Sequence, residues 1–285
     1  MMRRVGYVLL LSGFVSLVLR AQETPRVPAE NDVYCSGMVT SEPVPQDTYV
    51  ISGSDSQDRV VFSQDSLVFL NKGTAQGVKV GDEFFVERLV TEKLRLEWFV
   101  SQNTLLRAMG TTYEDEGRLR VVNAQRDTST AQVVYSCGYI QRGDLVLPFA
   151  QRPAPALKPA TKPDPFAPPS GKAKAMVVTT RAFGQVARSG TIVYVNLGSG
   201  QGVKVGDYFM VFRYQGGRSE NVYQLPGMAY QLYGFGSTPR PYAGSELPRD
   251  VLGEGIVLRA SPNAATVLIT GSQREIFVGD YVEVE

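Results

Sequence analysis

The chain has 285 residues, 43% of them hydrophobic, and a formal net charge of +1, a globular composition with room for more than one domain. This charge balance gives no basic surface for nucleic acid or for an anionic membrane. The chain has no histidine and only two cysteines, which excludes histidine-based triads and a four-ligand Cys/His zinc site, so we expect no cofactor and no nucleic-acid partner.

The N-terminus has the three parts of a secretory signal peptide. Arg3 and Arg4 give a positive start, residues 5–19 form a mostly apolar run, and Ala21 follows at a cleavage position. Arg20 ends the apolar run before the roughly 20 residues that a spanning helix needs. We predict a signal peptide at 1–21, no transmembrane span after its cleavage, and export to the periplasm, the outer envelope or the medium.

The sequence contains an internal duplication. Residues 65–88 and 190–213 align without a gap, and Gln76–Asp82 is identical to Gln201–Asp207. Similarity returns near the end of each copy, where Gly143-Asp144 aligns with Gly279-Asp280. Repeats of this kind indicate one structural unit that is written twice.

The duplication predicts an all-β protein of two tandem, small antiparallel barrel or sandwich domains. Copy two carries a longer segment between Arg213 and Gly253 than copy one does. The predicted organisation is an N-terminal extension at 22–32, β domain copy 1 at 33–149, a Pro-rich linker at 150–171 and β domain copy 2 at 172–285.

Short apolar runs bounded by turn residues predict the strands. Leu67–Leu70 and Ile192–Val195 open the matching segments, and residues 145–147 and 281–284 close the two copies. Val78 and Val80 alternate with Lys79, which predicts a half-buried strand there and at the matching residues of copy two. The only helix expected is a short amphipathic one within 94–108.

Glycines that accept positive φ and aspartates that accept backbone amides predict the turns. Asp82 and Asp207 occupy equivalent turns and belong to no evident catalytic pair, so we interpret them as turn stabilisers. The predicted turn residues are Gly77, Gly81, Asp82, Gly143, Asp144, Gly202, Gly206, Asp207, Gly279 and Asp280. Gly198–Gly202 is glycine-rich, but its spacing matches no phosphate-binding loop, and we expect a strand after it where such a loop needs a helix.

Residues 148–171 hold eight of the 17 prolines of the chain. Proline fixes φ and removes the amide donor, so this segment is expected to join neither a helix interior nor a sheet ladder. We predict an extended, semi-rigid tether, with a proline-motif ligand as the other interpretation.

Cys35 and Cys137 both belong to copy one. Export places them in an oxidising compartment, where a disulfide persists, and a bond between them is predicted to pin the N-terminal segment to the end of that copy. The alternative is two separately buried thiols, because sequence does not show whether the geometry permits a bond.

Aromatic residues concentrate in the longer segment of copy two. Tyrosine combines a flat apolar face with a hydroxyl, which suits recognition of sugar rings or proteins. The alternative is that the segment covers its own barrel. The candidate contact residues are Tyr214, Tyr223, Tyr230, Tyr233, Phe235 and Tyr242, with Trp98 as a further candidate in copy one.

The pattern N-x-G-x-x-x-G-V-K-V-G-D-x-F-x-V, present from Asn71 and more loosely from Asn196, resembles the C-terminal domain of flagellar assembly protein T. That resemblance covers about 24 residues of each copy and implies a small β domain of a periplasmic protein associated with the flagellar basal-body ring. The whole chain also resembles a family of exported bacterial proteins without an assigned activity, some of them labelled as LysM-like peptidoglycan binders, although no LysM motif is present. Neither resemblance supplies catalytic residues.

These observations predict a non-enzymatic exported protein that serves as a binding or scaffold module for an envelope protein assembly. Binding of peptidoglycan or another glycan is the alternative. A hydrolase that uses carboxylates alone is a third hypothesis, and it requires two acids within about 10 Å of each other in a cleft.

Overall fold

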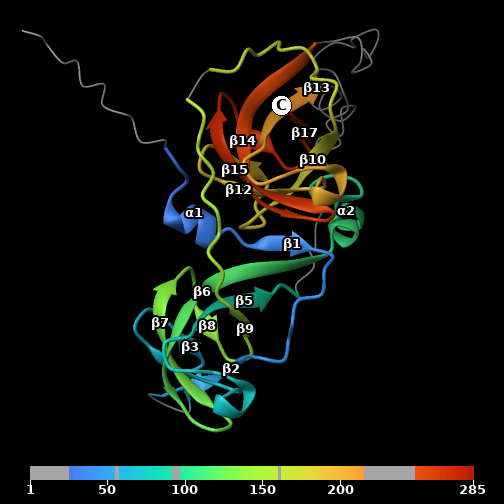
Figure 1. The fold of residues 1–285 in the computed structure, drawn as a ribbon. Helices are drawn as coiled ribbons and strands as arrows, with labels where there is room; N and C mark the ends of the chain where they lie inside the picture. The colour runs from blue at the N-terminus through green and yellow to red at the C-terminus, as the bar shows by residue number, and fades with distance from the viewer. Residues whose placement is uncertain (1–25, 55–57, 92–96, 160–161, 215–247) are drawn as a thin grey trace, which may run out of the picture.

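A computed structural model describes residues 26–54, 58–91, 97–159, 162–214 and 248–285. The fold is all-β, as predicted, and every strand pair within the described ranges is antiparallel. Figure 1 shows a curled sheet from the N-terminal half and a barrel from the C-terminal half, with β1 and helix α2 lying between them.

The curled sheet has the strand order β2-β4-β7-β6-β5-β9, and β1 adds to it by pairing with the first residues of β6. Its strands are β1 (Met38–Thr40), β2 (Val50–Gly53), β4 (Leu67–Leu70), β5 (Glu83–Leu89), β6 (Thr111–Ala124), β7 (Ser129–Ser136) and β9 (Leu145–Pro148). Strands β3 (Val61–Phe62) and β8 (Ile140–Gln141) form a separate pair.

The barrel repeats this strand order as β10-β12-β15-β14-β13-β17, and pairing of β10 with β17 closes it. Its strands are β10 (Lys174–Thr180), β12 (Ile192–Val195), β13 (Tyr208–Tyr214), β14 (Arg249–Ser261), β15 (Ala264–Ser272) and β17 (Tyr281–Val284). Strands β11 (Val186–Ala187) and β16 (Ile276–Phe277) form the counterpart of the β3–β8 pair. In the curled sheet the equivalent closure is one bridge between Tyr49 and Leu145.

The predicted turns have the same geometry in both copies. The Asp82 carboxylate accepts the Lys79 amide at 2.8 Å, and Asp207 accepts the Lys204 amide at 2.8 Å. At the second turn, Asp144 receives two hydrogen bonds from the Arg88 guanidinium, at 2.9 and 2.8 Å. In copy two, Arg213 binds Asp280 in the same way, at 2.7 Å for both bonds. The repeated aspartates therefore stabilise turns.

The prediction of a strand at Val78–Val80 is wrong. The short 3-10 helices η1 (Thr74–Gln76) and η2 (Ser199–Gln201) lead into turns, and the strands begin only at Glu83 and Tyr208. Val78 is buried, whereas Val80 is 65% exposed. Three alternating residues are too few to distinguish a strand from two successive turns. No long helix follows Gly198–Gly202, in agreement with a structural turn.

The helix predicted within 94–108 is present as α2 (Gln102–Met109). It begins only at Gln102, because Ser101 has a φ of 73° and interrupts helical geometry before it. A five-residue helix, α1 (Glu30–Tyr34), was not predicted. Pro148 is the last residue of β9 and pairs with Phe84, contrary to its predicted exclusion from the ladder. A proline is tolerated at such an end because no further amide is needed there.

The hydrophobic cores do not divide at the linker. One cluster fills the curled sheet and includes Val68, Leu119 and Val133. The larger cluster of the barrel also contains Val39 of β1 and Met109 of α2, both from the N-terminal half. The predicted division into two separate domains is therefore not shown, since the barrel core extends into copy one.

The described residues of the Pro-rich linker contain no helix or strand after Pro148. The linker lies against the barrel, where the Val251 amide donates to the Pro165 carbonyl at 2.9 Å. The buried Arg249 guanidinium donates to the carbonyls of Ala167 and Pro168 at 2.8 and 2.6 Å. These bonds hold the linker in place along the barrel, beyond what a free tether requires.

The repeated turns make a stability prediction. Gly77 and Gly202 have φ values of 87° and 88°, with open space around a Cβ, so alanine there adds backbone strain alone. We expect Gly77→Ala and Gly202→Ala each to lower the free energy of unfolding by about 1–2 kcal/mol. Gly271→Ala is the control, because its Cβ would meet Glu254 at an ordinary 3.8 Å without a positive φ. Urea unfolding would contradict the prediction if all three variants were equally stable.

Candidate functional site

The segment Cys35–Met38 lies between the curled sheet and the barrel. From the barrel, Tyr194 donates its hydroxyl to the Ser36 carbonyl at 2.9 Å and Arg181 donates to the Cys35 carbonyl at 2.5 Å. From the curled sheet, Asp115 accepts the Gly37 amide at 2.7 Å. We call this segment the seam, because side chains of both sheets bind its backbone.

Gly37 is the tightest point of the seam. Its φ is 65°, in the region that favours glycine. A Cβ there would lie 2.4 Å from the Tyr194 hydroxyl oxygen and 2.8 Å from the Tyr113 carbonyl oxygen. Any other residue would push the barrel and the curled sheet apart.

A cluster of four charged side chains surrounds the seam. Arg152 of the linker forms two hydrogen bonds with Asp115, at 2.9 and 2.8 Å, and its guanidinium lies 4.2 Å from the centre of the Phe85 ring. Arg259 of the barrel contacts Asp115 at 3.4 Å and Glu87 at 3.8 Å. Two acids and two arginines balance, which is what burial of charge requires.

Burial changes the pKa values in this cluster. Desolvation raises the pKa of Glu87 and lowers that of Arg259, although the opposite charges nearby act against both shifts. Glu87 Oε2 is buried and has no hydrogen-bond partner among the described residues. The cluster is therefore a structural junction, and its acids are neutralised by arginines.

The predicted disulfide between Cys35 and Cys137 is present, with the two Cα atoms 5.4 Å apart. It joins the seam to the residue after β7 and closes a loop of 102 residues. In the chain-entropy model such a loop stabilises the fold by about 4–5 kcal/mol at most. The seam is thus fixed covalently to the curled sheet.

A second acidic pair lies on the curled sheet. Arg88 contacts Glu116 at 2.6 Å and Asp144 at 2.8 Å. Burial raises the pKa of Glu116 to about 7, and the Arg88 charge only partly opposes this. Both acids share one arginine, and Asp144 also receives the Gln141 amide in its turn. This arrangement accounts for the pair as a structural one, and the hydrolase hypothesis stays a prediction.

Most of the predicted aromatic contacts, namely Tyr223, Tyr230, Tyr233, Phe235 and Tyr242, lie outside the described residues. Tyr214 ends β13, and its ring lies 5.4 Å from both Phe212 and Tyr281 between centres. Trp98 is half-buried and packs against the barrel core, so it helps to join the two sheets and is not presented freely to a ligand.

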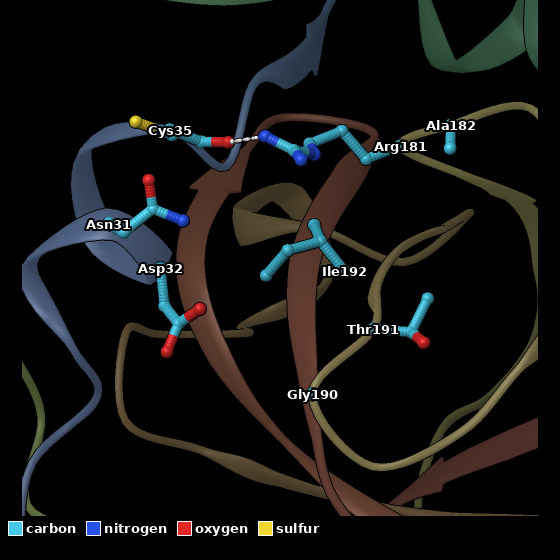
Figure 2. A pocket seen from close by; sticks show the side chains of 8 residues that line it. All are labelled: Asn31, Asp32, Cys35, Arg181, Ala182, Gly190, Thr191 and Ile192. Carbon is cyan, nitrogen blue, oxygen red and sulfur yellow. Dashed lines mark hydrogen bonds between the residues drawn. The ribbon is translucent and has the colours of Figure 1, made fainter. Parts of the chain in front are cut away.

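A pocket of about 160 Å³ opens between α1 and the barrel. Figure 2 shows Asn31 and Asp32 on the helix side, Arg181 reaching across to the Cys35 carbonyl, and Ile192 drawn between them. Ala182, Gly190 and Thr191 complete the lining. No local sequence pattern predicts this pocket, because its two sides are about 150 residues apart along the chain.

Sequence reasoning also missed Gly37, Arg152 and Arg259. Each makes its contacts with residues far along the chain, and none belongs to a local pattern. A glycine beside a cysteine and an arginine between prolines are both common, so neither is a signal by itself.

No protein-family model matches this chain, and no curated protein is significantly similar to it. Within the described ranges, no helix is long and apolar enough to cross a membrane. The same residues contain no group of three or more side chains that could hold a metal ion. The resemblance to the C-terminal domain of flagellar assembly protein T stays a prediction.

Glu116 predicts a pH dependence of stability. Its pKa in the folded protein is about 7, above the ordinary value of 4.5. Its contribution to the free energy of unfolding is therefore complete below pH 4.5 and is lost as the pH rises through 7. We expect this contribution to fall by roughly 1–3 kcal/mol across that interval. The decrease in the free energy of unfolding with pH should be smaller in Glu116→Gln than in the wild type. It should be unchanged in Glu42→Gln, an exposed control. Chemical unfolding at several pH values measures it, and equal slopes for the wild type and Glu116→Gln would contradict it.

Proposed function

We propose that this chain is an exported, non-enzymatic protein that acts as a scaffold in a cell-envelope protein assembly. The observation that carries the proposal is the junction, in which buried charges and apolar contacts join two sheets of one design and a disulfide fixes the seam to one of them. A fixed relative placement of two binding modules suits a protein that spaces its partners. Export rests on the N-terminal pattern and agrees with the disulfide.

The junction supports this role by its composition. Val39 and Met109 supply apolar contacts to the barrel, and the Gln102 amide donates to the Val178 carbonyl at 2.7 Å. The Asn263 amide reaches Ser41 at 3.2 Å on the same side. Apolar, polar and charged contacts together fix orientation more strictly than a flexible tether does.

The experiment is crosslinking in cells followed by mass spectrometry, with the full chain expressed at its native level. The proposal expects crosslinks to the subunits of one envelope assembly and co-purification with it. Cell fractionation of the same strain tests export. Crosslinks confined to cytoplasmic proteins, or to no protein, would overturn the proposal.

Arg259→Gln tests whether the junction matters for the assembly. Removing this guanidinium leaves Glu87 and Asp115 with Arg152 alone, and we expect a loss of about 2–4 kcal/mol in the free energy of unfolding. The amount of partner protein recovered with this variant should be lower than with the wild type, because the two sheets are held together less tightly. Arg120→Gln is the matched control, because its pair with Glu83 is largely exposed and contributes less than about 1 kcal/mol. Full partner recovery by Arg259→Gln would argue against a rigid scaffold.

Glycan binding is the second candidate, favoured by the aromatic group at the end of β13. Tyr281 is 38% exposed and Tyr214 half-buried, beside the fully buried Phe212. The Lys174 ammonium lies 3.4 Å from the Tyr214 hydroxyl. Exposed rings with polar neighbours suit stacking on sugars.

A pulldown with purified cell-wall glycan tests this candidate. We expect Tyr214→Ala and Tyr281→Ala each to reduce retention at least about fivefold, because a stacked ring contributes roughly 1 kcal/mol or more. Tyr139→Ala is the control, since Tyr139 is 67% exposed and lies on the curled sheet side. Equal retention of all three variants would remove glycan binding from consideration.

A further inference from the structure

The pocket between α1 and the barrel is lined by two side chains of opposite charge, Asp32 and Arg181, which do not form an ion pair with each other. Asp32 accepts the Ala29 amide at 3.2 Å, and Arg181 donates one hydrogen bond, to the Cys35 carbonyl. Among the described residues, neither side chain has an ion-pair partner. Other arginines of the molecule bind a carboxylate directly, as Arg88 does with Glu116 at 2.6 Å.

The bond to Cys35 fixes the guanidinium at the pocket wall. Nη1 is occupied by the carbonyl, which leaves the Nε and Nη2 donors of Arg181 for a ligand. A guanidinium held in this way binds a carboxylate through two parallel hydrogen bonds. Asp32 offers a carboxylate from the helix side, which suits an ammonium group.

The size and remaining lining of the pocket restrict the ligand. Its volume of about 160 Å³ is close to that of a cavity that holds benzene, so it has room for about six non-hydrogen atoms. Ile192 supplies apolar surface between the charged groups in Figure 2, and Ala182 adds to the lining beside Arg181. A small molecule with one cationic end, one anionic end and a short apolar part satisfies all three features.

We propose that this pocket binds a small α-amino acid zwitterion, with Asp32 receiving its ammonium group and Arg181 its carboxylate. A neutral sugar of the same size would leave both charges unpaired. A simple anion would face the Asp32 carboxylate, and a simple cation would face Arg181. The inference is independent of the scaffold role, because it concerns one pocket and no partner protein.

The disulfide makes the site dependent on oxidation. Cys35 lines the pocket and is bonded to Cys137, so the helix side of the pocket is fixed to the curled sheet. Arg181 is on the barrel, which means that the two charges are held apart by the junction. Reduction should therefore weaken ligand binding without altering either charged side chain.

The test is a titration of the oxidised full chain with L-alanine, in which binding is monitored by the chemical shifts of the backbone amides in NMR spectra. We expect saturable shifts confined to residues 31–35 and 181–192. Acetate and methylamine each carry one of the two charges and should need at least about tenfold higher concentration for the same effect. Dithiothreitol should weaken alanine binding at least about threefold.

Variants locate the two charges. Asp32→Asn and Arg181→Gln should each weaken alanine binding about tenfold, whereas Asp127→Asn and Arg126→Gln, two exposed controls outside the pocket, should bind as the wild type does. The wild-type titration keeps the proposal falsifiable if a variant folds poorly. Three results would overturn the proposal: no shifts at the highest alanine concentration used, shifts outside the pocket, or equal binding of acetate and alanine.

Discussion

The rest of the structure depends on the close approach of both sheets to the backbone of Gly37. Tyr194 from the barrel and Tyr113 from the curled sheet leave no space for a side chain there. The neighbouring carbonyls of Cys35 and Ser36 receive donors from the barrel, and the Gly37 amide is bound by Asp115. One short segment thus determines how far apart the two sheets lie, and the disulfide holds that segment in place.

The charged cluster follows from the same constraint. Bringing the sheets together around the seam buries Glu87 and Asp115, and a buried carboxylate is costly without a cation. Arg152 and Arg259 supply those cations from the linker and the barrel. The carboxylates of the curled sheet are therefore neutralised by arginines that lie outside it, which couples the folding of the two halves.

Sequence reasoning succeeded where the signal is local and failed where it is not. The strands at Leu67–Leu70 and Ile192–Val195 and the glycine-aspartate turns depend on neighbouring residues, and all were predicted. Val80 was placed wrongly because alternation over three residues also fits a pair of turns. The seam, the charged cluster and the pocket join residues that are far apart in sequence, such as Asp32 and Arg181, so no local pattern predicts them. The longest aromatic segment lies outside the described residues and stays untested.

The duplication separates the residues that maintain each fold from those that join the two. Arg88 and Asp144 recur as Arg213 and Asp280, and both pairs close a turn. The junction residues do not recur. Glu87 pairs with Asp115 across β5 and β6, whereas the same register position in the barrel pairs Phe212 with Val251. One barrel pattern thus has a charged patch in its first copy and an apolar one in its second. In a single first copy these carboxylates would lie in water, so the arginines of the linker and the barrel are needed because the barrel covers the patch.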